Sequence, residues 1–117
     1  MAFRGNQRLN KPMNELQADC LAGFFATQAK NQLGITGEDY HQMAEAAKEG
    51  GDPPNVVSHG TAEQRRAAFL AGAGFYKEQC SPLDMAKIAN LNDLTLRARY
   101  SQLLNQGRRT VSMSNSG

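Results

Sequence analysis

Apolar residues recur along this chain at the three- and four-residue spacing of amphipathic helices, and no segment reads convincingly as a strand. The first helix is predicted over residues 12–33, where Asn10 suits a cap, Pro12 a first turn and Gly34 a stop. Its apolar stripe consists of Met13, Leu16, Cys20 and Phe24, with Leu21 and Phe25 beside it. So wide an apolar face predicts that this helix lies in the core.

Two further helices are predicted to begin at capping boxes. Thr36 and Asp39 have the required spacing, and so do Thr61 and Gln64. The first of these helices ends at Gly50-Gly51, before Asp52-Pro53-Pro54. Their apolar stripes are Tyr40, Met43, Ala44 and Ala47 in one, and Ala67, Leu70, Ala71 and Phe75 in the other. Gly72 and Gly74 weaken the later helix but allow another backbone to approach closely.

A fourth helical segment begins at Ser81, with Pro82 in its first turn, and Asn90 and Asn92 suggest a break that divides it into two helices. The last stretch, residues 107–117, is polar and unpatterned, which predicts disorder. The expected fold is a small all-α bundle of about four helices, with the first helix central and buried. We divide the chain into a helical domain (1–80), a helical extension (81–106) and a tail (107–117).

Composition excludes some classes of protein. The 117 residues include 40% hydrophobic and 21% charged residues, which is ordinary for a soluble domain. The net charge of +2 is too small to indicate nucleic acid, and Arg97, Arg99, Arg108 and Arg109 read as a solvated helix face and tail. No apolar stretch approaches the roughly 20 residues of a membrane span. The N-terminus lacks the apolar region of a secretory signal, so the chain as written is expected in the cytoplasm.

The two cysteines, Cys20 and Cys80, are too few for a disulfide scaffold and do not form a C-x-x-C pair. Two states remain open for them. They can pair with each other across the fold in an oxidising compartment, or they stay thiols in a reducing cytosol. In the second case Cys20 reads as a buried free cysteine.

The segment Glu15-Leu16-Gln17-Ala18-Asp19-Cys20-Leu21-Ala22-Gly23 carries the strongest chemical signal. Glu15 and Asp19 lie four residues apart, so they share one face of the helix. Two like charges at this spacing repel each other unless a positive group lies beside them. A zinc ion, or an imidazole bound to zinc, is one reason for a chain to keep both.

This string resembles the E-x-x-A-D helix of zinc metallopeptidases of the gluzincin kind, and most closely that of bacterial neutral zinc metallopeptidases. A second segment, His59-Gly60-Thr61-Ala62-Glu63-Gln64-Arg65, resembles the H-G-T/S-x-E-Q-R segment of the same family. Phe69, Gly72, Gly74 and Phe75 follow it as in the family, and Cys80 takes the place of the family's second cysteine. The resemblance covers about residues 9 to 80.

The resemblance implies a zinc site and roles for four residues. In such enzymes two histidines of an H-E-x-x-H helix bind zinc, and the glutamate between them is the general base. Glu15 would be the third ligand, and Asp19 would hydrogen-bond a ligand histidine. His59 would face the active site and stabilise the tetrahedral intermediate. Arg65 would pair with a carboxylate to hold a loop.

The chain departs from the family at the most important point, because it contains no H-E-x-x-H. Its only histidines are His41 and His59, and 14 residues precede Glu15, too few for the zinc-binding helix and its supporting strands. The general base and two of the three protein ligands are therefore absent. We expect this chain alone not to bind zinc, although Glu15, His41 and His59 together offer a third, weaker hypothesis of a reused metal site.

Each of these residues also has a plain structural reading. Glu15 and Asp19 fit a solvated helix edge, His41 a surface position on the second helix, and His59 a helix entry. Two functions follow. The chain is a truncated or partial metallopeptidase that is inactive alone, or it is a non-catalytic helical module derived from a peptidase that binds a protein partner. In both cases a protein partner covers the face left open by the missing half. A fragment of a longer parent would belong to a membrane-anchored or periplasmic protein.

Overall fold

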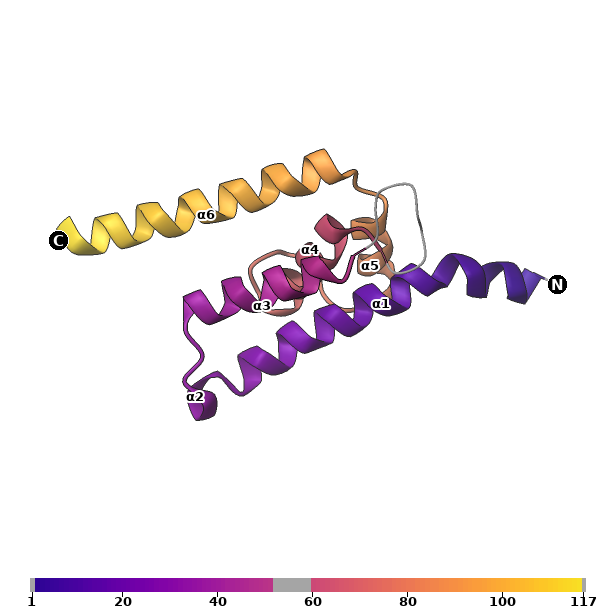
Figure 1. The fold of residues 1–117 in the computed structure, drawn as a ribbon, viewed down its shortest axis with the longest axis horizontal. Helices are drawn as coiled ribbons and strands as arrows, with labels where there is room; N and C mark the ends of the chain where they lie inside the picture. Colours follow the sequence, from indigo (N-terminus) through magenta and orange to yellow (C-terminus); the bar gives the residue numbers. More distant parts are fainter. Residues whose placement is uncertain (1, 52–59, 117) are drawn as a thin grey trace.

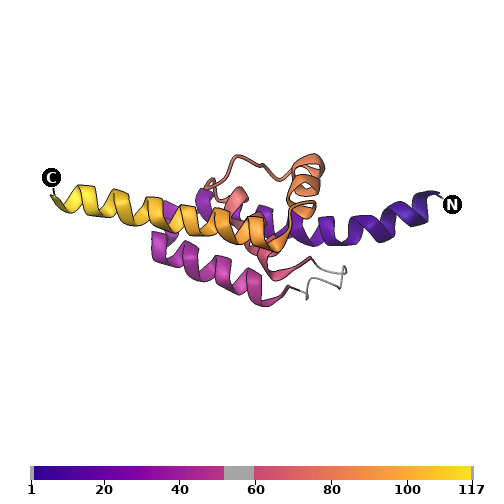
Figure 2. The same cartoon turned by 90° about the horizontal axis from the view of Figure 1, so that it is seen from above.

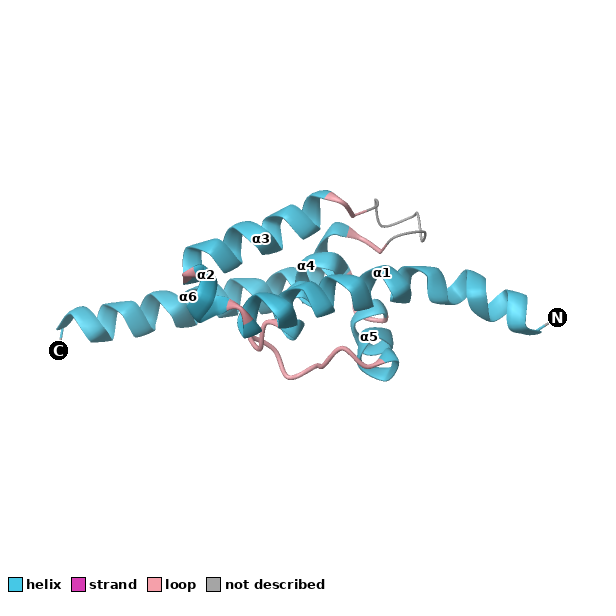
Figure 3. Ribbon diagram, turned by 90° about the horizontal axis from the view of Figure 1, so that it is seen from below, coloured by secondary structure: helices cyan, strands magenta, loops and turns pink. Residues whose placement is uncertain are grey.

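The computed structural model describes the backbone of residues 2–51 and 60–116 and the side chains of residues 13–51 and 60–106. Along the chain lie the helices α1 (Ala2–Gln28), α2 (Lys30–Leu33), α3 (Gly37–Glu49), α4 (Ala62–Gly72), α5 (Pro82–Ala89) and α6 (Asp93–Ser116) (Figure 1). No strand occurs in these described ranges (Figure 3). The predicted all-α bundle is confirmed.

Local capping chemistry sets where the middle helices begin. At α3 the Asp39 amide donates to the Thr36 hydroxyl (3.2 Å) and the Thr36 amide donates to the Asp39 carboxylate (2.8 Å). At α4 the Gln64 and Thr61 amides make the same reciprocal pair with the Thr61 hydroxyl and the Gln64 side-chain oxygen, at 3.2 and 3.0 Å. Both predicted capping boxes are confirmed. Each box satisfies two amides that would otherwise stay unpaired at the start of the helix.

The predicted break after Ala89 is also confirmed. Ser81 caps α5 by accepting a hydrogen bond from the Asp84 amide (3.1 Å). The Asn92 side chain then accepts from the Thr95 amide (2.8 Å) in the first turn of α6. Each asparagine side chain competes with the helix for backbone groups, so the chain turns here and a new helix starts.

The boundaries of the first helix differ from the prediction. Helix α1 begins at Ala2, ten residues before Pro12, and ends at Gln28, so that Pro12 lies inside it. Short α2 follows, and Gly34 ends it in the left-handed conformation (φ 64°), as its predicted stop role requires. The predicted start at residue 12 was wrong, because it relied on the preference of proline for a first turn, whereas here Pro12 occupies an interior position that proline normally disfavours.

Helix α4 occupies the middle of the bundle and contacts α1, α3, α5 and α6 (Figures 1 and 2). Nearly all of it is buried: Glu63, Arg66, Ala67, Ala68, Phe69, Leu70 and Ala71. One core cluster joins Leu16 and Cys20 of α1 to Met85, Ile88 and Leu96, so residues 81–106 pack into the same core as the rest. A second joins Tyr40 and Ala44 of α3 to Phe69, Leu70 and Tyr100. The predicted central α1 thus shares the centre with α4.

Helices α1 and α4 approach each other through glycine. A methyl group on Gly72 would overlap the backbone of Cys20, and one on Gly23 would overlap the backbone of Phe69. The predicted close approach at Gly72 is confirmed. Gly74 serves another purpose: no atom crowds it, but its φ of 92° lies in the left-handed region that favours glycine.

Part of the apolar face predicted for the first helix is not buried. Leu16 and Cys20 are fully buried, but Leu21, Phe24 and Phe25 are 42, 38 and 65% exposed. The core face of α1 instead runs through Leu16, Asp19, Cys20, Gly23 and Ala26, all of them buried. Because α1 is apolar on more than one side between residues 16 and 26, periodicity could not identify the side that packs.

The two ends of the described chain extend away from the bundle in opposite directions (Figure 1). Helix α6 continues to Ser116. The disorder predicted for residues 107–117 falls on residues whose side chains lie outside the described part of the chain. Within the described ranges, no helix combines the length and the apolar character that a bilayer span requires.

Candidate functional site

The two sequence segments that carry the family resemblance meet at an ion pair. Arg65 of α4 donates from Nε to Asp19 Oδ2 (2.7 Å) and from Nη2 to Asp19 Oδ1 (2.9 Å), in the two-pronged geometry that suits a guanidinium and a carboxylate. Its third nitrogen, Nη1, donates to the carbonyl oxygen of Gly50 at the end of α3 (2.8 Å). The predicted pairing of Arg65 with a carboxylate is therefore present, and the carboxylate is Asp19.

Close backbone contacts fix this junction of α1, α3 and α4. A methyl group on Gly51 would overlap the backbone of Ala62, and one on Gly60 would press on the Leu16 side chain (3.1 Å). Gly60 also has a φ of 86°, a conformation that side-chain-bearing residues rarely adopt. The glycines let the chain turn into α4 directly against α1, and the capping box of Thr61 then sets the direction in which Arg65 projects.

Burial and pairing act in opposite senses on Asp19. Asp19 is 8% exposed, and its burial raises the pKa of the carboxyl above its ordinary 3.8. The hydrogen bonds and the positive charge of Arg65 lower this pKa, and the charge of Glu15 adds a smaller increase. Burial has the largest effect, because water is excluded from the charged form.

Glu15 lies one turn before Asp19 on α1 and is half-buried. Within the described part of the chain it makes no hydrogen bond or ion pair. It continues a stripe of α1 that includes Ala18 and Ala22, three and seven residues later, both exposed. Its carboxylate is thus available, at one end of a surface lined by small side chains.

The other predicted ligands are not brought to Glu15. His59 lies outside the described residues. His41 on α3 is half-buried rather than a surface residue: its ring stacks on Tyr100 of α6 (6.0 Å between centroids) and Nδ1 contacts the Tyr100 hydroxyl. Among the described residues no three His, Cys, Asp or Glu side chains are close enough to hold a metal ion. These residues do not fit a complete zinc site, and Glu15 offers a single carboxylate towards one.

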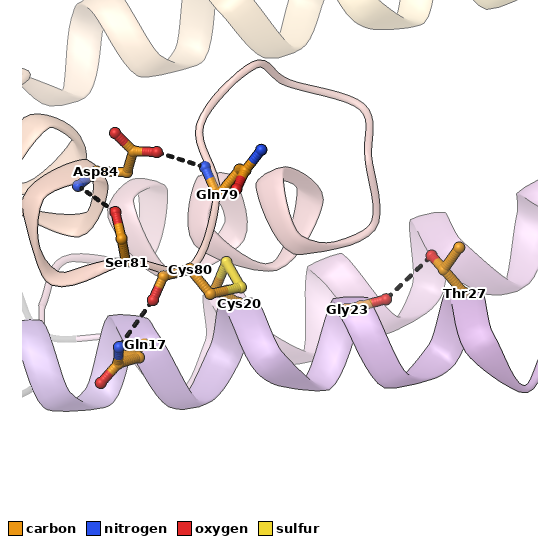
Figure 4. Close-up of a disulfide and its surroundings, with 8 residues drawn as sticks. All are labelled: Gln17, Cys20, Gly23, Thr27, Gln79, Cys80, Ser81 and Asp84. Carbon is orange, nitrogen blue, oxygen red and sulfur yellow. Dashed lines mark hydrogen bonds between the residues drawn. A yellow bond between two sulfur atoms is a disulfide. The ribbon is translucent and has the colours of Figure 1, made fainter.

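A disulfide joins Cys20 of α1 to Cys80, 60 residues later, in the segment between α4 and α5 (Figure 4). Gln17, one turn earlier on α1, donates to the Cys80 carbonyl oxygen (2.7 Å), and the Gln79 amide donates to Asp84 (2.8 Å). This resolves the two open states in favour of the bridge, and the reading of Cys20 as a free cysteine is wrong. The bridge anchors the α4–α5 segment to α1.

A buried charge cluster connects α3, α4 and α6, and its extent was not predicted from the sequence. Arg66, 4% exposed, pairs with Glu63 one turn earlier and with Glu45 of α3 (3.0 Å). Its guanidinium lies 3.8 Å above the ring of Tyr100. The i,i+3 spacing of Glu63 and Arg66 was the only available signal. The partners on α3 and α6 depend on the tertiary fold.

An open groove of about 690 Å³ runs between α1 and the α4–α5 segment. We call it the α1 groove. It is lined by Leu21, Phe24 and Phe25 of α1, by Ala71 and Gly72 of α4, and by Gly74 and residues 76–81 of the α4–α5 segment. Phe24 and Phe25 were predicted to lie in the core, but they line this open groove instead.

Comparison of the chain with protein-family models, curated proteins and solved structures found no match. The resemblance to zinc metallopeptidases accordingly rests on the two sequence segments alone.

Proposed function

We propose that this chain is the helical part of a zinc metallopeptidase of the bacterial neutral kind, and that it does not hydrolyse peptide bonds by itself. In this proposal Glu15 supplies one zinc ligand, and the remaining ligands and the general base come from an H-E-x-x-H segment that this sequence does not contain. The proposal assigns no catalytic step to the described residues alone.

One observation supports this proposal above the others: the Asp19–Arg65 pair. Asp19 belongs to the E-L-Q-A-D string and Arg65 to the T-A-E-Q-R string, 46 residues apart, and two hydrogen bonds join them. Two unrelated motifs would have no reason to meet through a partly buried, two-pronged ion pair. A single site built from both segments accounts for this arrangement.

The geometry around Asp19 also suits the role that the resemblance gives it. A carboxylate has about four acceptor positions, and Arg65 uses two of them. Asp19 can therefore hold a further donor, such as the N–H of a ligand histidine, while Arg65 fixes its orientation. Glu15, one turn away and without a partner among the described residues, lies on the neighbouring exposed stripe.

The disulfide supports a location outside the cytoplasm. Bridges such as Cys20–Cys80 persist in oxidising compartments and are rare in the reducing cytosol. We infer that the parent protein works in the periplasm or on the outer side of a membrane, as expected for a fragment of a longer protein, rather than in the cytoplasm.

The test adds the absent half. The chain is fused downstream of the H-E-x-x-H-bearing segment of a bacterial neutral zinc metallopeptidase, and zinc per protein and casein hydrolysis are measured. We expect the fusion to bind zinc and hydrolyse casein, and Glu15→Ala to weaken zinc binding about tenfold or more. Glu49→Ala, an exposed carboxylate at the end of α3, is the matched control and leaves both unchanged.

Two results would contradict the proposal. Undiminished zinc affinity in the Glu15→Ala fusion would remove Glu15 from the metal site. Stoichiometric zinc in the unfused, untagged chain, lost in Glu15→Ala, would show that the chain binds metal without the absent segment.

A second candidate function, a non-catalytic protein-interaction module, is favoured by the outer side of α1. A helix that is apolar all round is normally buried on all sides. Here Ala18, Leu21, Ala22 and Phe25 are exposed. Stable binding of a partner protein by a chain that gains no zinc or activity in the fusion experiment would select this function over the first.

A further inference from the structure

The α1 groove takes no part in the proposed zinc site. Taking 100° per residue, Leu21 and Phe24 lie on the side of α1 opposite the Glu15–Asp19 edge, and Phe25 lies ten residues, about 15 Å, further along the helix than Glu15. The side chains that line the groove are mainly apolar, and Phe25 alone is 65% exposed. Exposed apolar area of this kind, gathered in a concave surface, is typical of a binding site.

The wall opposite α1 is held in place before anything binds. The Cys20–Cys80 bridge and the Gln17 hydrogen bond to the Cys80 carbonyl oxygen attach its end to α1. Arg99 of α6 pairs with Glu78 (2.7 Å) and lies 4.4 Å above the Tyr76 ring. A preformed wall lowers the ordering cost of binding, so apolar contact in the groove is converted more fully into affinity.

The groove is lined by one acidic and one basic residue, and they differ in their partners. Glu78 is 7% exposed and is neutralised by Arg99, so its carboxylate is not offered to a ligand. Lys77 is exposed, and in the described part of the chain it forms no ion pair. An apolar groove with a single uncompensated ammonium group at its edge is complementary to an apolar ligand that carries a carboxylate.

We propose that the α1 groove binds a short segment of a partner protein that presents aromatic or aliphatic side chains together with an Asp or Glu that pairs with Lys77. The groove has room for a few side chains and is open on its outer side, which suits a segment of a larger chain rather than an enclosed small molecule. The inference goes beyond the peptidase relationship and holds for either proposed function.

The experiment selects peptides from a random phage-displayed library on the full, oxidised chain. The enriched peptides are then synthesised, and their affinities are measured by fluorescence polarisation. We expect enriched peptides to combine at least two large apolar residues with an acidic residue. Phe25→Ser and Lys77→Glu each weaken binding about tenfold or more.

Matched controls separate the groove from general surface effects. Leu94→Ser removes an apolar side chain of α6 that is 74% exposed and outside the groove, and Lys30→Glu reverses an exposed charge of α2 that is also outside the groove. Both retain full affinity, and far-ultraviolet circular dichroism confirms that all four variants fold.

Three outcomes overturn the proposal: peptides without an acidic residue, affinities unchanged by Phe25→Ser or Lys77→Glu, or a concentration-dependent dimer in sedimentation that Phe25→Ser abolishes. The last would assign the groove to a second copy of this chain. None of them changes the Glu15 result in the fusion experiment, so the two proposals fail independently.

Discussion

Gly72 of α4 lies so close to Cys20 of α1 that a single methyl group on Gly72 would overlap the Cys20 carbonyl group. The atoms in the way are backbone atoms of a helix, which cannot move aside as the end of a flexible side chain can. The same turn of α1 carries the disulfide and forms one side of the α1 groove. The spacing of the two helices therefore depends on the absence of a side chain at Gly72, as it does at Gly23 of α1.

We expect Gly72→Ala to lower the free energy of unfolding by about 1–3 kcal/mol or more, the usual cost of forcing extra atoms into a packed contact. Gly37→Ala is the control, because no atom lies within 4 Å of the added methyl group there. Alanine at Gly37 is expected to be neutral or to stabilise by about 0.4–1 kcal/mol. Urea denaturation of both variants measures this, and equal stabilities would disprove the close contact.

The Asp19–Arg65 pair is expected to make a large contribution to stability. Removing Arg65 leaves the buried Asp19 carboxylate without its positive partner, so Arg65→Gln should cost about 1–3 kcal/mol. The Arg65→Gln variant also lacks the hydrogen bond that Arg65 donates to the Gly50 carbonyl oxygen in the parent chain. A double-mutant cycle with Asp19→Asn isolates the pairwise term from this loss.

Lys87→Gln provides the comparison with an exposed ion pair. Lys87 and Asp84 lie 3.4 Å apart with Lys87 60% exposed, and such exposed pairs contribute little to stability. A coupling energy between Asp19 and Arg65 no larger than that of the exposed Lys87–Asp84 pair would argue against an organised junction.

The stability of the Arg65→Gln variant should depend on pH in a direction that follows from Asp19. Burial already raises the pKa of Asp19 above 3.8, and Arg65 opposes this increase, so removing Arg65 raises the pKa further. The folded state then binds a proton that the unfolded state releases, over the range between these two pKa values. The contribution of Asp19 to the stability of this variant is therefore fully present below the pKa of Asp19 in the unfolded state, and it is lost as pH rises through the pKa of Asp19 in the folded state.

Urea denaturation from about pH 4 to about pH 7 checks this prediction. The difference in unfolding free energy between the parent chain and Arg65→Gln should widen as pH rises. Carbon-13 chemical shifts of the Asp19 carboxyl group, measured over the same range, report its pKa directly. A difference independent of pH would mean that Asp19 does not carry the effect.

Local rules of helix capping explain why most of the fold could be predicted. Thr36, Thr61 and Ser81 act on amides within three residues, so their effect is written in a few consecutive letters. The start of α1 could not be predicted because proline normally marks a first turn and destabilises a helix interior, whereas α1 continues through Pro12.

The candidate site was harder to predict because its contacts span long distances along the chain. The sequence indicated that Arg65 would pair with a carboxylate but could not say which, since Asp19 is 46 residues away. The stacking of His41 on Tyr100 depends on how α6 packs across the bundle, and no local pattern encodes this. Because α1 is apolar on more than one side, its own sequence does not determine which side is buried. Its packing partners, α4 and the disulfide-anchored segment, determine it.

The Cys20–Cys80 bridge offers the last prediction. It closes a loop of 60 residues, and the loss of chain entropy in the unfolded state predicts a stabilisation of roughly 4 kcal/mol. We expect the free energy of unfolding of the reduced protein, or of the Cys20→Ala/Cys80→Ala double variant, to be lower by this amount. Urea denaturation measures the difference. Intact mass, higher by two hydrogen atoms after reduction, verifies the redox state.

The expected loss should be selective, because the bridge acts beside Gly72 and at one end of the α1 groove. Hydrogen exchange should increase most in residues 76–81, which lose their covalent attachment to α1. It should increase least in α3, whose Tyr40 and Ala44 belong to the second core cluster, away from the bridge. A reduced protein as stable as the oxidised one, with exchange unchanged in residues 76–81, would show that glycine packing and the Gln17 hydrogen bond hold this segment without the bridge.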